Sequence, residues 1–133
     1  MKFFLRIVLI AGLSWPALMF LPWWSSAVVA FVVGLLLSQA KKRRMFGKKQ
    51  PPALAFLAGL IALFLLVGVF AFIQNSGNGG LLAGKISAII LGDGGAPMEP
   101  GIFLVLVSAL IAGLVGGFSA MTGNLLGEAL KSN

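Results

Sequence analysis

Residues 101–121 read GIFLVLVSALIAGLVGGFSAM, a run that contains no charged residue. An α-helix rises about 1.5 Å per residue, so about 20 helical residues cross the roughly 30 Å hydrocarbon core of a membrane. The run has this length and is apolar throughout. It therefore predicts a transmembrane helix.

Small side chains recur along this run at helical spacing. At about 100° per residue, all of them except Gly117 fall within an arc of about 100°, and Gly113 with Gly117 forms a GxxxG pair. A face without bulk lets another helix approach closely. The predicted packing residues here are Ala109, Ala112, Gly113, Gly116, Gly117, Ala120 and Gly123. An earlier stretch repeats the pattern with Ser26, Ala30, Gly34 and Ser38. Either face could pack within this chain's own bundle or dock a partner subunit.

Three further apolar stretches lie at about residues 3–20, 23–39 and 53–73. Together the four stretches predict an all-α, polytopic membrane protein with four transmembrane helices in a single membrane domain, residues 1–133. Pro16 should kink the first helix, and Leu21-Pro22 predicts a tight hairpin between the first two. A signal peptide is the weaker interpretation of the first stretch, because cleavage near Ser26 would leave no polar spacer before Val28.

Residues 74–100 form the longest polar region and are expected to be the external loop. The loop opens with a glycine-rich segment, 74–80, for which irregular structure is expected. Residues 81–91 then place Leu82, Ile86, Ile89 and Ile90 near one helical face. Since 11 helical residues are too few to span a bilayer, this segment predicts a short helix lying in the membrane interface.

The chain carries a formal net charge of +7, and six of its ten basic residues are concentrated in the loop 41–50. They are Lys41, Lys42, Arg43, Arg44, Lys48 and Lys49. With Lys2, Arg6 and Lys131 on the same side and only Lys85 opposite, the positive-inside rule places both termini and this loop in the cytoplasm. Trp23 and Trp24 then fall at the far interface. The loop either sets topology alone or also binds anionic lipid. Arg6 is expected to snorkel toward the interface.

The composition excludes several kinds of site. Cysteine, histidine and tyrosine are absent, and the only acidic residues are Asp93, Glu99 and Glu128. Thiolate and imidazole ligation are therefore impossible. We expect no cofactor, no metal site, no catalytic residue and hence no enzyme. A nucleic-acid partner is not expected either, because the basic residues cluster in one loop rather than over a folded face.

Two segments resemble known membrane proteins. Gly113–Thr122 resembles the Gly-rich, Ser/Thr-containing helix of small four-helix fluoride channels, although this chain lacks that family's glycine- and arginine-rich first helix and its weak charge bias. Leu21-Pro22-Trp23-Trp24 and Leu114–Asn124 together are similar to a family of small uncharacterised four-helix bacterial inner-membrane proteins. That similarity implies the inner (plasma) membrane of a bacterium, but no activity and no functional residues.

The expected function follows from small-residue faces combined with few chemically active side chains. We expect a non-catalytic helix-packing subunit, or accessory, of a larger inner-membrane complex, whose partners are the lipid bilayer and other membrane subunits. The alternative is a small homo-oligomeric channel or permease for a small solute. Its path would be lined by Ser108, Ser119, Thr122 and Asn124.

Overall fold

The structure is a computed structural model that describes residues 2–39, 51–92 and 99–132. These residues form five helices and confirm the all-α prediction. The helices are α1 (Lys2–Phe20), α2 (Ser25–Gln39), α3 (Pro52–Gly77), α4 (Leu81–Leu91) and α5 (Pro100–Ser132).

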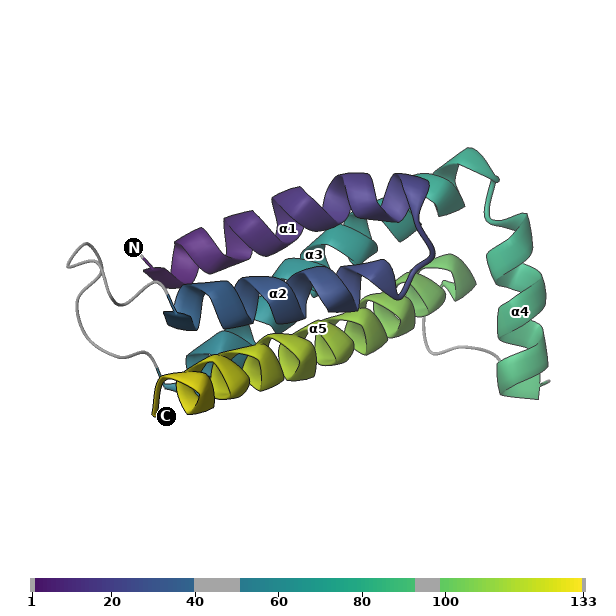
Figure 1. The fold of residues 1–133 in the computed structure, drawn as a ribbon. Helices are drawn as coiled ribbons and strands as arrows, with labels where there is room; N and C mark the ends of the chain where they lie inside the picture. The colour runs from purple at the N-terminus through teal and green to yellow at the C-terminus, as the bar shows by residue number, and fades with distance from the viewer. Residues whose placement is uncertain (1, 40–50, 93–98, 133) are drawn as a thin grey trace.

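Helices α1, α2, α3 and α5 run side by side as a bundle (Figure 1). Both α1 and α5 pack against α2 and α3, so α1 and α5 occupy opposite corners. The first residues of α1 and the last of α5 lie at the same end of the bundle, here named the terminal end. The opposite end, named the turn end, carries the α1–α2 connection. There α4 lies at a steep angle to the bundle and contacts α3 and α5 (Figure 1).

Three of the helices are long and apolar enough to cross a membrane. The qualifying segments are Phe3–Phe20, Pro52–Gly77 and Pro100–Leu130, with mean hydropathies of 1.9, 2.9 and 2.4. Helix α2 is apolar but has 15 residues, which corresponds to about 22 Å of helix against a hydrocarbon core of roughly 30 Å. The fourth span therefore stays a prediction.

Two helices end later than predicted. Helix α3 continues to Gly77, so the expectation of irregular structure is wrong for residues 74–77. Its last carbonyls are satisfied, because the N–H groups of Asn78 and Gly80 donate to the carbonyls of Gln74 and Asn75, both at 3.1 Å. The reversal falls instead on Gly79 and Gly80, whose φ angles of 60° and 72° favour glycine.

Helix α5 continues to Ser132, well past the predicted end at residue 121. The added segment contains leucine, alanine and glutamate, which are good helix formers. It also prolongs the small-residue face with Gly123 and Gly127, both buried. The extension is therefore held by packing as well as by propensity.

The α1–α2 connection is a tight hairpin, as predicted. Pro16 lies inside α1, which continues to Phe20. Leu21 and Pro22 lead into a turn at Trp23 and Trp24, and α2 begins two residues later than predicted. Helix boundaries routinely differ by this amount.

Glycines on α5 bring its backbone close to both neighbours. Toward α3, a methyl group added at Gly116 would lie 2.8 Å from the carbonyl oxygen of Gly59, and one added at Gly113 would lie 3.1 Å from that of Leu60. Toward α2, a methyl group at Gly123 would lie 3.0 Å from the backbone nitrogen of Leu35. Larger side chains at these positions would force the helices apart.

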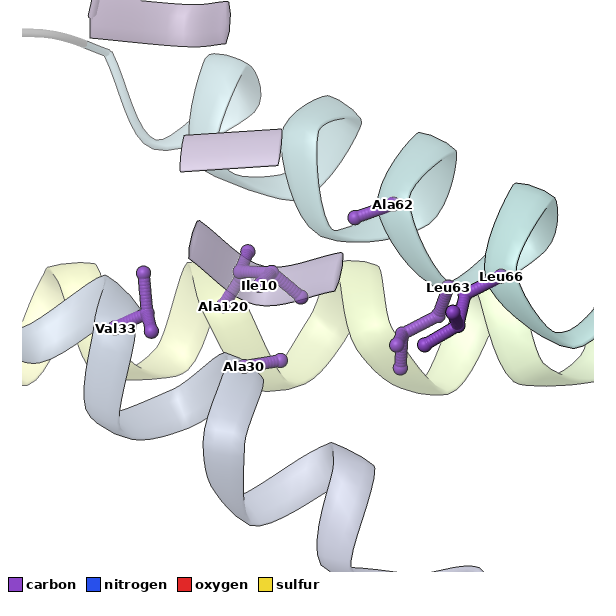
Figure 2. Close-up of a cluster of buried hydrophobic side chains, with 7 residues drawn as sticks. All are labelled: Ile10, Ala30, Val33, Ala62, Leu63, Leu66 and Ala120. Carbon is purple, nitrogen blue, oxygen red and sulfur yellow. The ribbon is translucent and has the colours of Figure 1, made fainter. Parts of the chain in front are cut away.

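The bundle closes on an apolar core to which α1, α2, α3 and α5 all contribute (Figure 2). Its buried members are Ile10, Ala30, Val33, Ala62, Leu63, Leu66 and Ala120. Large apolar side chains are also abundant on the outer surface, for example Phe4, Leu65 and Phe118, which are 70%, 56% and 62% exposed. Water-soluble monomers rarely expose such extensive apolar surface.

The close approach of α5 to its neighbours leads to a first prediction. We expect Gly116→Leu and Gly123→Leu to lower the free energy of unfolding by about 1–3 kcal/mol or more, because the added side chain overpacks a backbone contact. Thermal unfolding in mild detergent measures the change. Gly12→Leu on α1 is the matched control, because Gly12 is exposed and a Cβ atom there meets nothing within 4 Å. Equal stability of all three variants would contradict the close packing.

Candidate polar site inside the bundle

Arg6 lies in the interior of the bundle, near the start of α1. Its side chain is 5% exposed, and Nη2 donates a hydrogen bond of 2.7 Å to Oδ1 of Asn124 on α5. Asn124 is 1% exposed. Because α1 and α5 occupy opposite corners, the long arginine crosses the diagonal of the bundle. It links two helices that are otherwise joined through α2 and α3.

Glu128 completes this group. It follows Asn124 by one helical turn, which places both side chains on the same side of α5. The half-buried Glu128 carboxylate attracts the Arg6 guanidinium electrostatically. Burying an isolated charge is costly, and a nearby opposite charge offsets much of that cost. We name Arg6, Asn124 and Glu128 the terminal polar cluster.

The terminal polar cluster contains two unused hydrogen-bond donors. Within the described part of the chain, Nη1 of Arg6 and Nδ2 of Asn124 are buried and have no hydrogen-bond partner. Ser14, two turns further along α1, has an unpartnered buried hydroxyl as well. A buried donor without a partner costs about 1–3 kcal/mol. The cluster can therefore donate hydrogen bonds to a water oxygen or another acceptor. Arg6 stays positively charged because guanidinium groups stay protonated.

The expectation that Arg6 snorkels is wrong for this structure. Helix α5 continues beyond residue 121 and carries Asn124 and Glu128 to the level of Arg6, where they offer an internal partner. A signal was present in the sequence. Gly116, Ala120, Asn124 and Glu128 follow one another at four-residue intervals, so the polar pair continues the small-residue face.

The predicted packing residues line contacts within this chain. On α5 all of them are buried except Ala112, which is half-buried. On α2 the four predicted residues are buried, and the Ser26 and Ser38 hydroxyls donate to the carbonyls of Trp23 and Leu35 at 2.9 and 3.1 Å. Gly34 meets the Ala120 backbone, and Ser38 abuts Gly127. The structure thus brings the two predicted faces together in the terminal half of the bundle.

Of the four residues proposed for a solute path, only Asn124 is buried. Ser108 and Thr122 are exposed and Ser119 is half-buried. The Thr122 hydroxyl donates to the Phe118 carbonyl of its own helix at 2.8 Å. Asn124 is occupied by Arg6.

The remaining candidate sites are the basic loop and any metal-binding group. The basic residues Lys41, Lys42, Arg43, Arg44, Lys48 and Lys49 lie outside the described residues. Within the described residues, no group of three or more His, Cys, Asp or Glu side chains could hold a metal ion.

A double-mutant cycle tests the Arg6–Asn124 contact. We expect Arg6→Met to lower the free energy of unfolding by about 3–5 kcal/mol, since it leaves polar partners buried and unpaired. Asn124→Leu should cost about 1–3 kcal/mol. The double variant should cost less than the sum, with a coupling of about 0.5–3 kcal/mol in thermal or denaturant unfolding. Lys85→Met, at an exposed site on α4, should be neutral. Strict additivity would mean that the hydrogen bond contributes nothing.

No protein-family model, no curated protein and no solved structure matches this chain. The resemblances of residues 21–24 and 113–124 therefore stay predictions, and the function of the chain rests on its own residues and their geometry.

Proposed function

We propose that this chain is a non-catalytic helix-packing subunit, or accessory, of a larger membrane protein complex in the inner (plasma) membrane of a bacterium. In this proposal α1, α2, α3 and α5 all span the bilayer. The three long apolar helices support the placement, and so does the large apolar surface around the bundle. Helix α2, which is shorter, would cross where the bilayer thins locally or with flanking residues at its ends.

The proposed orientation places both termini and the basic loop 41–50 in the cytoplasm. Its support is geometric as well as compositional, because Lys2 and Lys131 lie in helices that meet at the terminal end (Figure 1). Helix α2 ends and α3 begins at that same end, and residues 41–50 join them in the sequence. Lys85 is on α4 at the turn end. This separation of basic residues satisfies the positive-inside rule.

Helix α4 is proposed to lie in the external interface. It lies at the turn end, at a steep angle to the bundle, and contacts α3 and α5 (Figure 1). Ala83 and Ser87 are its buried residues and face the bundle, whereas Leu81 and Ile89 are 73% and 82% exposed. An 11-residue helix with this exposed apolar surface is too short to span but suited to the interface.

One observation favours a packing subunit over a channel, namely the closed apolar core. Ile10, Leu63 and Ala120 are at most 1% exposed and come from three different helices (Figure 2). A conducting path needs polar groups or water through most of the membrane depth. A chain whose interior is closed by such side chains at the level of this core contributes helices to an assembly rather than a pore of its own.

A homo-oligomeric channel or permease is the second candidate, and the buried Arg6 favours it. Ionisable residues inside a membrane protein often mark ion or substrate pathways. Because the core closes the bundle beside the terminal polar cluster, such a path would have to run between copies of the chain.

Topology is tested with introduced cysteines, which is simple because the chain has none. In intact cells we expect an impermeant thiol reagent to label Ser76→Cys, at the turn end, but not Lys48→Cys, in the basic loop. The opposite pattern would reverse the orientation. Equal labelling at both positions would indicate dual topology and would favour the channel.

Purification in mild detergent and reconstitution separate the two functions. A packing subunit should co-purify with at least one different membrane polypeptide, identified by mass spectrometry, and liposomes containing it alone should conduct no anion, cation or small solute. Flux from the isolated chain that is abolished by Ser119→Ala or Arg6→Met would overturn the subunit role. Gly12→Ala serves as the matched neutral variant, because it adds a methyl group into open space.

A further inference from the structure

A cavity of about 490 Å³ opens in the turn-end half of the bundle. All four helices of the bundle contribute to its wall. The wall residues include Leu18 from α1, Ser26 from α2, Val67 and Phe70 from α3, and Ala112 and Val115 from α5. Its volume falls within the range of about 300–1,000 Å³ that is usual for small-molecule sites.

The cavity lies beyond the closest contacts between α2 and α5, toward the turn end. The tightest approaches of α2 to α5 are at Gly34, Gly123 and Gly127, all toward the terminal end. Ser26 lies two turns before Gly34 on α2, and its wall partner Ala112 lies two turns before Ala120 on α5. At this level Ser26 and Ala112 present small side chains to the cavity. The helices do not close the space, and the side chains do not fill it.

The chemistry of the wall selects an apolar occupant. Three wall residues carry a polar side-chain group, namely the hydroxyls of Ser26 and Ser108 and the indole N–H of Trp23. The Ser26 hydroxyl already donates to the Trp23 carbonyl at 2.9 Å. Water needs about two to four polar partners in a buried site, which this wall does not supply. An empty cavity forfeits dispersion contacts along its whole lining. A hydrocarbon occupant would restore these dispersion contacts without needing hydrogen-bond partners.

The opening of the cavity shows how such an occupant would enter. The exposed members of the wall are Trp23, Ser108 and Ile111. Trp23 follows the α1–α2 hairpin and is 75% exposed, as suits an indole ring at the membrane interface. From Ser108 to Val115 the wall descends about 10 Å along α5. The site is thus open near the external interface and apolar below it.

We propose that this cavity binds one acyl chain of a membrane lipid, with the lipid headgroup at the level of Trp23 and Ser108. The inference rests on the membrane placement proposed above but not on the subunit role. The acyl chain lies between α1, α2, α3 and α5 and completes the packing of the turn-end half. The bound lipid is therefore distinct from the lipids that surround the outer surface.

Photo-crosslinking tests this site with the full chain in nanodiscs of phosphatidylcholine that carries a diazirine in one acyl chain. Mass spectrometry should locate adducts on cavity residues such as Leu18, Phe70 and Val115. Ala112→Phe on α5 and Ala71→Phe on α3 each add bulk to the wall of the cavity. Each should lower these adducts about tenfold, equivalent to about 1.4 kcal/mol of binding. Leu110→Phe, at a 53% exposed position on α5, is the matched control and should leave them unchanged.

Three outcomes would overturn the proposal. Adducts spread evenly over outward residues such as Leu65, Leu110 and Leu114 would mean that the cavity holds no specific chain. Cavity adducts that persist in both filling variants, with unfolding midpoints equal to that of Leu110→Phe, would assign the labelling to another site. A chain that does not enter nanodiscs at all would overturn the membrane placement, and the lipid site with it.

Discussion

The architecture depends on how closely α5 can approach its two neighbours. Between helices in lipid the hydrophobic effect supplies little driving force, so van der Waals contact and hydrogen bonds must hold the bundle. Gly113 and Gly116 face α3, and Gly123 faces α2, each near a backbone atom of the neighbouring helix. Helix α5 is therefore the axis of the fold. Helix α1 packs against α2 and α3 and completes the bundle.

The terminal polar cluster joins α1 to α5, two helices that do not pack directly against each other. Helix α1 is diagonal to α5 and has no small-residue seam with it, yet Arg6 reaches Asn124 across the interior. A buried hydrogen-bonded charge contributes little net stability compared with an apolar pair, but misplacing it is expensive. Its effect is thus on specificity, because a rotated α1 would separate the buried Arg6 guanidinium from Asn124.

Much of the fold could be predicted because hydropathy and helical spacing are local properties. The presence of five helices, the hairpin at Pro22 and the small-residue face of α5 all follow from nearby residues. The end of α5 could not be placed, since Asn124 and Glu128 look like the polar exit of a span until α1 supplies Arg6 as their partner. The inward orientation of Arg6 depends on that same contact between residues far apart in the sequence. The basic loop lies outside the described residues, so its expected role stays a prediction.

The two halves of the bundle differ in how closely their helices pack. In the terminal half, glycine contacts and the Arg6–Asn124 bond fix the helices at one separation and one rotation. In the turn-end half, Ser26 and Ala112 face a cavity, and the chain leaves the bundle to form α4. Packing interactions fall off steeply with distance. Close helix contacts in the terminal half therefore do not close the cavity in the turn-end half. In our proposal a lipid acyl chain, rather than a residue of this chain, fills the cavity in the turn-end half.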